Sequence, residues 1–140
     1  GVVEGRNSTR PPATLRGTET VLLVEDQAQV RAVAAEILQK HGYRVIAAQN
    51  AGEALLLCET HRGTIHLLLT DVVMPRMSGA ELARRLASTR PNMRVLCMSG
   101  YTDDSVVRHG ALESGIAFLQ KPFTPESLTR RVREVLDEKR

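Results

Sequence analysis

Short apolar runs alternate with longer amphipathic segments along most of this 140-residue chain. Each run is too short for a helix and too uniformly apolar for a strand with one wet face, which is typical of a strand buried on both faces of a parallel sheet. The segments between them carry apolar residues at helical spacing. The pattern therefore predicts an α/β protein with a five-stranded, doubly wound parallel sheet and five helices. The expected strands span 20–24, 43–48, 65–70, 93–98 and 116–120, and the expected helices span about 27–41, 50–61, 78–90, 103–113 and 124–136.

Polar residues mark where several of these helices begin. Asn50, Ser78 and Thr124 are of the kind that cap a helix N-terminus, and Pro125 suits the first helical position. Gly42 is a natural stop for the first helix. In that helix the apolar residues at helical spacing are Val30, Val33, Ala34, Ile37 and Leu38.

The charge distribution argues against a nucleic-acid-binding surface. The formal net charge is +3, and two of these charges belong to residues 1–18, which leaves the remainder nearly neutral. Residues 1–18 have no apolar period, so we expect a flexible linker there and one folded domain over residues 19–138. No apolar run approaches the ~18 residues of a membrane span, so we expect no membrane contact by this domain. The two cysteines form no C-x-x-C pair, and we expect a cytoplasmic setting.

The residues able to carry chemistry lie at the ends of the predicted strands. Glu25 and Asp26 follow the first strand, Asp71 the third, Ser99 the fourth and Lys121 the fifth. Because the carboxyl ends of parallel strands share one edge of a sheet, these side chains are expected to converge on one cleft. Taken singly, each also fits a solvated loop residue or a helix cap. Complementary groups at four strand ends favour a functional site instead.

The grouping of charges indicates a type of chemistry. Clustered carboxylates repel one another unless a cation lies between them, and their hard oxygen atoms suit Mg²⁺. A carboxylate held beside Mg²⁺ and an ammonium group can attack a phosphoryl group and form an aspartyl phosphate. The Lys121 ammonium and the Ser99 hydroxyl would then bind the phosphoryl oxygens.

Four stretches of the chain match one known family. They are Val24-Glu25-Asp26, Asp71-Val72-Val73-Met74-Pro75-x-Met77-Ser78-Gly79, Met98-Ser99-Gly100-Tyr101 and Lys121-Pro122-Phe123. Together they resemble the receiver domain of two-component response regulators, over about residues 19–137. The resemblance implies a flavodoxin-like, or CheY-like, doubly wound sheet with strand order 2-1-3-4-5, which agrees with the number of predicted elements.

The resemblance also implies a role for each residue. Asp71 would be the phosphoacceptor, assisted by Lys121 and Ser99, and the Lys121-Pro122 peptide bond is expected to be cis. Within the acid pair, Asp26 is favoured as the direct metal ligand. The groups implied to hold Mg²⁺ are Glu25, Asp26, Asp71 and the backbone carbonyl of Val73.

A switch is implied as well. Phosphorylation would draw Ser99 towards Asp71, and Phe118 would rotate into the vacated space, while the bulky Tyr101 would cover the site. The surface of the fourth helix, fifth strand and fifth helix would change, and it is also a candidate homodimer face. Phe118 equally fits an ordinary core aromatic. Gly110 makes the fourth helix the weakest of the five predictions.

One position departs from a common family pattern. Val73, two residues after Asp71, has no polar group to orient an attacking water molecule. We hypothesise that the phosphoryl group lasts longer here than in domains with a polar residue at this position.

Other classes of function fit the sequence less well. A phosphohydrolase of the haloacid dehalogenase type needs a second Asp where Val73 stands. A flavodoxin-like cofactor domain needs a Gly-rich phosphate loop where Glu25-Asp26-Gln27 stands. A phosphate-independent interaction module keeps the same fold, and Mg²⁺ binding would separate it from a receiver. We expect the domain to be a phosphoacceptor rather than a turnover enzyme.

The resemblance implies a histidine kinase or a histidine phosphotransfer domain as the partner, docking on the first helix near Val30. The first strand and the 98–102 segment look like C-terminal receivers of hybrid sensor histidine kinases, the parent that we favour. Because the sequence ends soon after the fifth helix, we expect any further domain to precede residue 1. A stand-alone receiver is the alternative, and a DNA-binding domain beyond Arg140 also stays open. The sequence leaves open as well whether the parent is a kinase or is anchored in a membrane.

Overall fold

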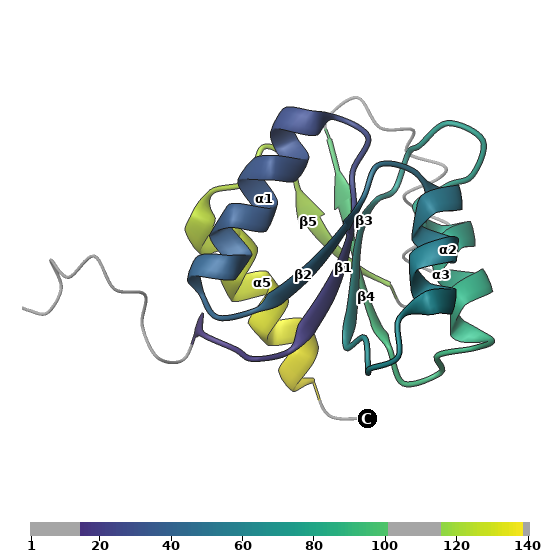
Figure 1. The fold of residues 1–140 in the computed structure, drawn as a ribbon. Coiled ribbons are helices and arrows are strands. Elements are labelled where there is room, and N and C mark those ends of the chain that lie inside the picture. The colour runs from purple at the N-terminus through teal and green to yellow at the C-terminus, as the bar shows by residue number, and fades with distance from the viewer. Residues whose placement is uncertain (1–14, 101–115, 139–140) are drawn as a thin grey trace, which may run out of the picture.

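The computed structural model describes residues 15–100 and 116–138 and shows a three-layer α/β fold (Figure 1). A five-stranded parallel sheet forms the middle layer, in the order β2-β1-β3-β4-β5. The predicted sheet and strand order are therefore confirmed. The strands are β1 (Thr20–Val24), β2 (Arg44–Ala48), β3 (Leu67–Asp71), β4 (Arg94–Ser99) and β5 (Ala117–Gln120). The helices of the described residues are α1 (Ala28–Lys40), α2 (Ala51–Thr60), α3 (Gly79–Ala87) and α5 (Pro125–Asp137).

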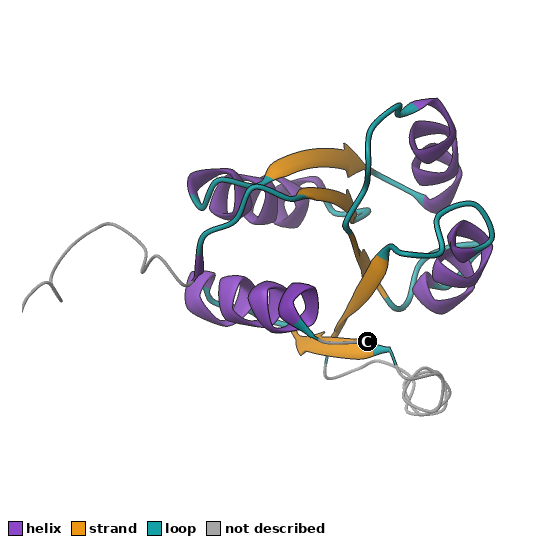
Figure 2. Cartoon of the chain, turned by 90° about the horizontal axis from the view of Figure 1, so that it is seen from below, coloured by secondary structure: helices purple, strands orange, loops and turns teal. Residues whose placement is uncertain are grey.

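The helices cover the two faces of the sheet in pairs. α1 and α5 lie on one face, and α2 and α3 lie on the other (Figure 1, Figure 2). Val21 and Leu23 of β1 belong to the core beneath α1 and α5, whereas Leu22 and Val24 belong to the core beneath α2 and α3. Every residue of β1 and β3 is buried. Burial on both faces explains why these strands appear in the sequence as uninterrupted apolar runs.

The predicted helix starts are confirmed by their hydrogen bonds. Oδ1 of Asn50 accepts from the third amide of α2 at 2.7 Å, and Oγ of Ser78 accepts from the third amide of α3 at 3.1 Å. At the start of α5, Thr124 and Ser127 form a reciprocal capping box. Gly42 has the positive φ of 98° that suits glycine after a helix end.

The apolar residues at helical spacing in α1 are not all buried. Ala34 and Leu38 are fully buried and Ile37 packs partly against the core, but Val33 is 51% exposed. Helical periodicity places residues on a common face, yet it does not show how far the sheet and α5 reach around the helix. Val33 therefore shares the helical spacing of the core residues without belonging to the core.

Some helix predictions fall where the structure gives no description. The helix expected at 103–113 and the side chain of Tyr101 lie outside the described residues. Among the helices of residues 15–100 and 116–138, the longest have 13 residues. None of these helices has the length and apolar character needed to cross a membrane.

The segment before β1 is fastened to the face that carries α1 and α5. Arg133 of α5 donates to the carbonyl oxygen of Arg16 at 3.2 Å and to the two carboxylate oxygens of Glu19 at 3.1 and 2.7 Å. The Gly17 amide donates at 2.9 Å to the carbonyl of His41, the residue that caps the C-terminus of α1. A Cβ on Gly17 would lie 2.3 Å from the Tyr43 ring. Contacts with the folded unit thus begin ahead of residue 19.

Candidate functional site

Four strands bring the predicted site residues to one edge of the sheet. Glu25 directly follows β1, Asp71 ends β3, Ser99 ends β4 and Lys121 follows β5. β3 and β4 each extend one residue further than predicted, because Asp71 and Ser99 continue the ladders of the sheet. The expected convergence is confirmed by distances for Glu25, Asp71 and Lys121, and Ser99 ends the strand that pairs with both β3 and β5.

The Lys121 ammonium lies between two carboxylates. Its Nζ is 2.6 Å from Oδ1 of Asp71 and 2.7 Å from Oε1 of Glu25. The Glu25 side chain is fully buried, and that of Asp71 is 9% exposed. The peptide bond between Lys121 and Pro122 is cis, as predicted. Because little water reaches these charges, the contacts are stronger than those of an ordinary surface ion pair.

Three carboxylates gather beside Lys121. One oxygen atom from each of Glu25, Asp26 and Asp71 lies within 4.8 Å of the other two. Glu25 and Asp71 are buried, whereas Asp26 is exposed, so the cluster faces solvent at Asp26. Carboxylate oxygens with access to water fit Mg²⁺, which prefers oxygen ligands and keeps several of its waters. In residues 15–100 and 116–138 this is the one such group of potential metal-binding side chains.

The buried carboxylates and Lys121 shift one another's protonation. Burial raises the pKa of Asp71 to about 7, and the hydrogen bond and charge of Glu25 add to the rise, while Lys121 opposes it. Burial would raise the pKa of Glu25 too, but hydrogen bonds with Asp71, Lys121 and the Gln27 amide hold it below its usual value. Burial would lower the pKa of Lys121, yet its hydrogen bonds to both carboxylates raise it. Of the two buried carboxylates, Asp71 is the one whose pKa rises into the neutral range.

The Ser99 hydroxyl is buried at the same edge and lacks a partner. Ser99 is 2% exposed, and its Oγ makes no hydrogen bond in the described part of the chain. The backbone carbonyl of Ser99 accepts from the Lys121 amide at 2.8 Å, so the strand itself is well held. A buried hydroxyl without a partner costs about 1–3 kcal/mol. Such a group is typical of a site that receives a polar ligand.

A tight loop carries the chain from Asp71 into α3. The Gly79 amide donates to the carbonyl of Val72 at 2.9 Å, and a Cβ on Gly79 would lie 2.1 Å from the carbonyl oxygen of Asp71. Arg76 has a φ of 74°. The Met77 amide donates to the Pro75 carbonyl at 2.8 Å, so Arg76 is the central residue of a γ-turn. Val73 exposes half of its side chain. The use of its backbone carbonyl as a metal ligand stays a prediction.

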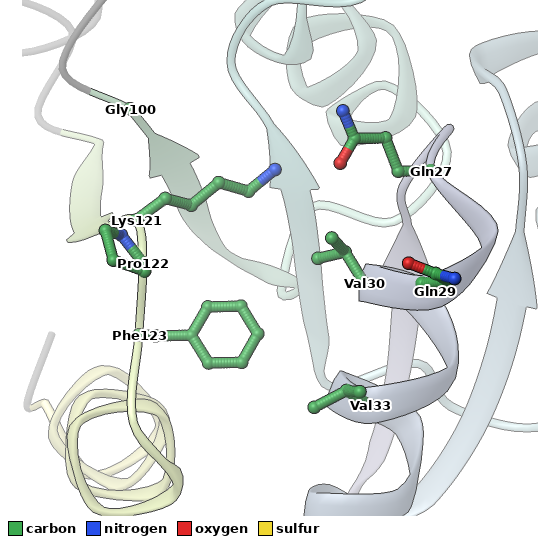
Figure 3. A pocket seen from close by; sticks show the side chains of 8 residues that line it. All are labelled: Gln27, Gln29, Val30, Val33, Gly100, Lys121, Pro122 and Phe123. Carbon is green, nitrogen blue, oxygen red and sulfur yellow. The ribbon is translucent and has the colours of Figure 1, made fainter.

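A pocket of about 510 Å³ opens beside Lys121, between α1 and the segment that follows β5. In Figure 3 the Phe123 ring faces Val30 and Val33 across the pocket, and the Lys121 side chain extends above them towards Gln27. The exposed Val33 of α1 lines this pocket. The lining residues are Gln27, Gln29, Val30, Val33, Gly100, Lys121, Pro122 and Phe123.

The switch residues are only partly described. Phe118 is partly buried on β5, outside both described cores, and its carbonyl accepts from Nε of Arg131 at 2.9 Å. Nothing in the described residues decides between a switch residue and an ordinary core aromatic at Phe118. The switch roles of Phe118 and Ser99 stay predictions, and that of Tyr101 lies outside the described residues.

Two contributors to the site were missed in the sequence. The Gln27 amide donates to Oε2 of Glu25 at 3.0 Å, and Nη1 of Arg31 donates to the backbone carbonyl of Glu25 at 2.7 Å. A backbone amide leaves no trace in a sequence pattern. Arg31 follows Glu25 by six residues and could have been noticed only as a cation in the second turn of α1.

The sequence agrees with one protein family over most of its length. Residues 21–133 match the family model of the response regulator receiver domain. The chain therefore belongs to the response regulator receiver domain family. Domains of this family interact with histidine kinases or phosphotransfer proteins, and they generally bind Mg²⁺.

Similar proteins include parts of large kinases and small regulators. The sensor kinase CckA of Brucella abortus is 39% identical over 88% of this chain, which spans 13% of that kinase. The response regulator receiver protein CpdR of the same organism is 30% identical over 83% of this chain and 95% of its own length. The chain is thus comparable in length to a whole small regulator and to a small part of the sensor kinase.

Solved structures agree with the fold. The receiver domain of the hybrid histidine kinase CckA superposes with a TM-score of 0.70 at 34% identity, covering 84% of this chain and 99% of that domain. A CheY-like receiver domain protein from Methanospirillum hungatei gives a TM-score of 0.76 at 30% identity, covering 86% of this chain and 95% of that protein.

Proposed function

We propose that the domain accepts a phosphoryl group on Asp71 from a phosphorylated histidine of a histidine kinase or phosphotransfer domain. The observation that carries this proposal is the position of the Asp71 carboxylate, 2.6 Å from the Lys121 ammonium and inside the cluster of three carboxylates. A nucleophile with a cation beside it and a cluster suited to Mg²⁺ meets the needs of phosphoryl transfer, in which positioning and charge neutralisation provide most of the catalysis.

The chemistry uses the residues as they lie. An ionised oxygen of Asp71 attacks the phosphorus atom, a P–O bond forms as the P–N bond breaks, and the imidazole leaves with the bonding electrons and takes up a proton. Lys121 and the Ser99 hydroxyl bind phosphoryl oxygens as their charge develops. Mg²⁺, when held by Glu25, Asp26, Asp71 and the carbonyl of Val73, supplies further positive charge at those oxygens.

The same groups support a switch. The Ser99 hydroxyl has no hydrogen bond to lose among the described residues, so a phosphoryl oxygen on Asp71 gives it its first partner. Movement of Ser99 towards that oxygen opens space for Phe118. The altered surface includes β5 and α5 and serves as the output or homodimer face.

The pocket beside Lys121 suits a histidine-bearing helix. Val33 is exposed, and Val30 and Phe123 add apolar surface next to the phosphoacceptor. A partner helix that lays an apolar stripe on this surface brings its phosphohistidine to the carboxylate edge of the sheet.

For the parent protein we favour a hybrid sensor histidine kinase that presents this domain in the cytoplasm. The similarity to the CckA sensor kinase and to the receiver domain of hybrid histidine kinase CckA supports this choice. The similarity to CpdR supports the alternative, a stand-alone receiver.

The test is intact mass after incubation with Mg²⁺ and acetyl phosphate, with Asp71→Asn as the matched control. We expect one added phosphoryl group in the wild type, none in the variant, and none when Mg²⁺ is chelated. A gain that survives Asp71→Asn would assign the phosphoacceptor to another residue. No gain and no Mg²⁺ binding would favour a phosphate-independent interaction module.

A further inference from the structure

Glu25 is held at every polar group by a different part of the chain. Its amide donates to the carbonyl of Ala48 in β2 at 3.1 Å, and its carbonyl accepts from Nη1 of Arg31 in α1 at 2.7 Å. Its Oε1 accepts from Lys121 at 2.7 Å, and its Oε2 accepts from the Gln27 amide at 3.0 Å. A fully buried carboxylate has to be satisfied in this way. The hydrogen bond from Arg31 to the backbone carbonyl of Glu25, however, does not satisfy the carboxylate.

That carbonyl belongs to the peptide group that joins Glu25 to Asp26. A peptide group is planar, so a donor on its oxygen fixes the direction in which the chain leaves Glu25 and therefore where Asp26 begins. Asp26 is exposed and directly follows the fixed residue. The Arg31 guanidinium is a charge-assisted donor on a regular helix, which makes it a stiff support for this peptide.

We propose that Arg31 is a positioning residue for the carboxylate cluster, acting through the backbone between Glu25 and Asp26. The inference rests on the proposed function, because it assumes that Glu25, Asp26 and Asp71 receive Mg²⁺. With the peptide held, the Asp26 and Glu25 oxygens keep the spacing within 4.8 Å that the structure shows. Without the guanidinium, the peptide rotates, and ordering Asp26 becomes part of the cost of binding.

A purely structural role for Arg31 predicts a different result. In that case its loss would lower the stability of the fold and leave the Mg²⁺ affinity of the folded molecules unchanged. Partners beyond the ligands themselves commonly change metal affinity by 10–100-fold, so the two roles are separable by measurement.

The experiment is a titration of the domain with Mg²⁺ alone, followed by the NMR shifts of backbone amides, below the unfolding temperature of every variant. Arg31→Met keeps an unbranched apolar stem but removes the donor, and Arg31→Lys restores a charged donor. Arg84→Met, on the exposed face of α3, is the matched control. We expect the Mg²⁺ dissociation constant to rise about tenfold in Arg31→Met, to recover most of the way in Arg31→Lys, and to stay unchanged in Arg84→Met.

The phosphorylated fraction gives a second readout. At saturating Mg²⁺, Arg31→Met should reach the wild-type phosphorylated fraction with acetyl phosphate, because Asp71, Lys121 and Ser99 are untouched. A dissociation constant within twofold of the wild type in Arg31→Met overturns the positioning role. If Arg31→Met does not fold, Arg31→Gln takes its place, with an expected rise of about threefold. A wild-type domain that binds no Mg²⁺ contradicts the proposed function itself, so the two failures are distinguishable.

Discussion

At the scale of single residues, Asp71 is subject to opposing influences. Burial and the neighbouring Glu25 favour its neutral form, while Lys121, 2.6 Å away, favours its ionised form. The first two effects dominate and place its pKa at about 7, well above the usual value of 3.8. A nucleophilic carboxylate with such a pKa is half protonated near neutral pH, so both its reactivity and its contribution to stability depend on pH.

The first prediction concerns this titration without added metal. An acid whose pKa is raised by folding binds its proton more tightly in the folded state, so its contribution to stability is complete below pH 3.8 and is lost as the pH rises through about 7. We expect the ¹³C shift of the Asp71 carboxyl carbon to titrate near pH 7, and Asp71→Asn to remove the matching fall in the free energy of unfolding. A midpoint near pH 4 would contradict this assignment.

The second prediction concerns Val73, which exposes half of its side chain two residues from Asp71. A polar side chain at this exposed position would orient a water molecule towards the phosphoryl group. We expect Val73→Asn to shorten the lifetime of the phosphorylated domain by about tenfold or more, in the range of general acid–base effects. The decay of the phosphorylated mass after removal of the donor measures this, with Val73→Ala as the apolar control. An unchanged or slower decay in Val73→Asn would reject the hypothesis.

At the scale of elements, two arginines donate hydrogen bonds to the C-terminal ends of helices, far from the carboxylate cluster. Arg90, in the α3–β4 connection, donates to the carbonyls of Cys58 and His61 at 2.9 and 2.8 Å and to that of Gly63 at 2.9 Å. Arg94 at the start of β4 donates to the carbonyls of Val135 and Glu138 at the end of α5. The last carbonyls of a helix have no partner within it, and a cation also suits this end of its dipole. These contacts anchor α2 and α5 at the edge opposite the carboxylates.

The third prediction follows from the position of Arg90. Arg90→Met leaves the carbonyl groups at the end of α2 without their donor, so we expect the free energy of unfolding to fall by about 1–3 kcal/mol. Arg84→Met, on the exposed face of α3, should change it by less than about 0.5 kcal/mol. Urea denaturation of the two variants provides the comparison. Equal effects would mean that water replaces Arg90 at no cost.

At the scale of the whole molecule, Arg133 joins parts of the chain that are distant in sequence. One guanidinium binds Glu19 and the Arg16 carbonyl before β1, the Tyr43 hydroxyl beyond α1, and Asp137 in its own helix. Hydrogen bonds to Arg133 hold the pKa of Glu19 below its usual value despite partial burial. The entry of the chain into β1 is therefore fixed against α5, whose first turn follows Lys121 by only a few residues.

The fourth prediction tests this connection. Arg133→Met should free the segment before β1, so we expect the Gly17 amide, bonded at 2.9 Å to the carbonyl that caps α1, to exchange its hydrogen about tenfold faster or more. The free energy of unfolding should fall by about 1–3 kcal/mol, the cost of unpaired buried polar groups. Arg130→Met, exposed on the same helix, is the control. Slow exchange at Gly17 in Arg133→Met would show that the backbone contact alone holds the segment.

The sequence by itself determined the layers of this fold and the edge at which its chemistry lies. Apolar runs such as 67–69 report burial on both faces, and parallel strands bring Asp71, Ser99 and Lys121 to one edge whatever the details of packing. Helix caps such as Asn50 and Ser78 could also be predicted from the sequence, because each acts within one turn of its own helix.

Only the tertiary structure decided which groups meet and which are left unpaired. In the folded chain Lys121 contacts the carboxylates of both Glu25 and Asp71, and Arg31 donates to the backbone carbonyl of Glu25. The Ser99 hydroxyl has no hydrogen-bond partner among the described residues. The tertiary structure also left Val33 exposed, although Val33 has the same helical spacing as the buried Ala34 and Leu38. The physical reason is that periodicity fixes the face on which a side chain lies, whereas its neighbours depend on rotamers and on how distant elements pack.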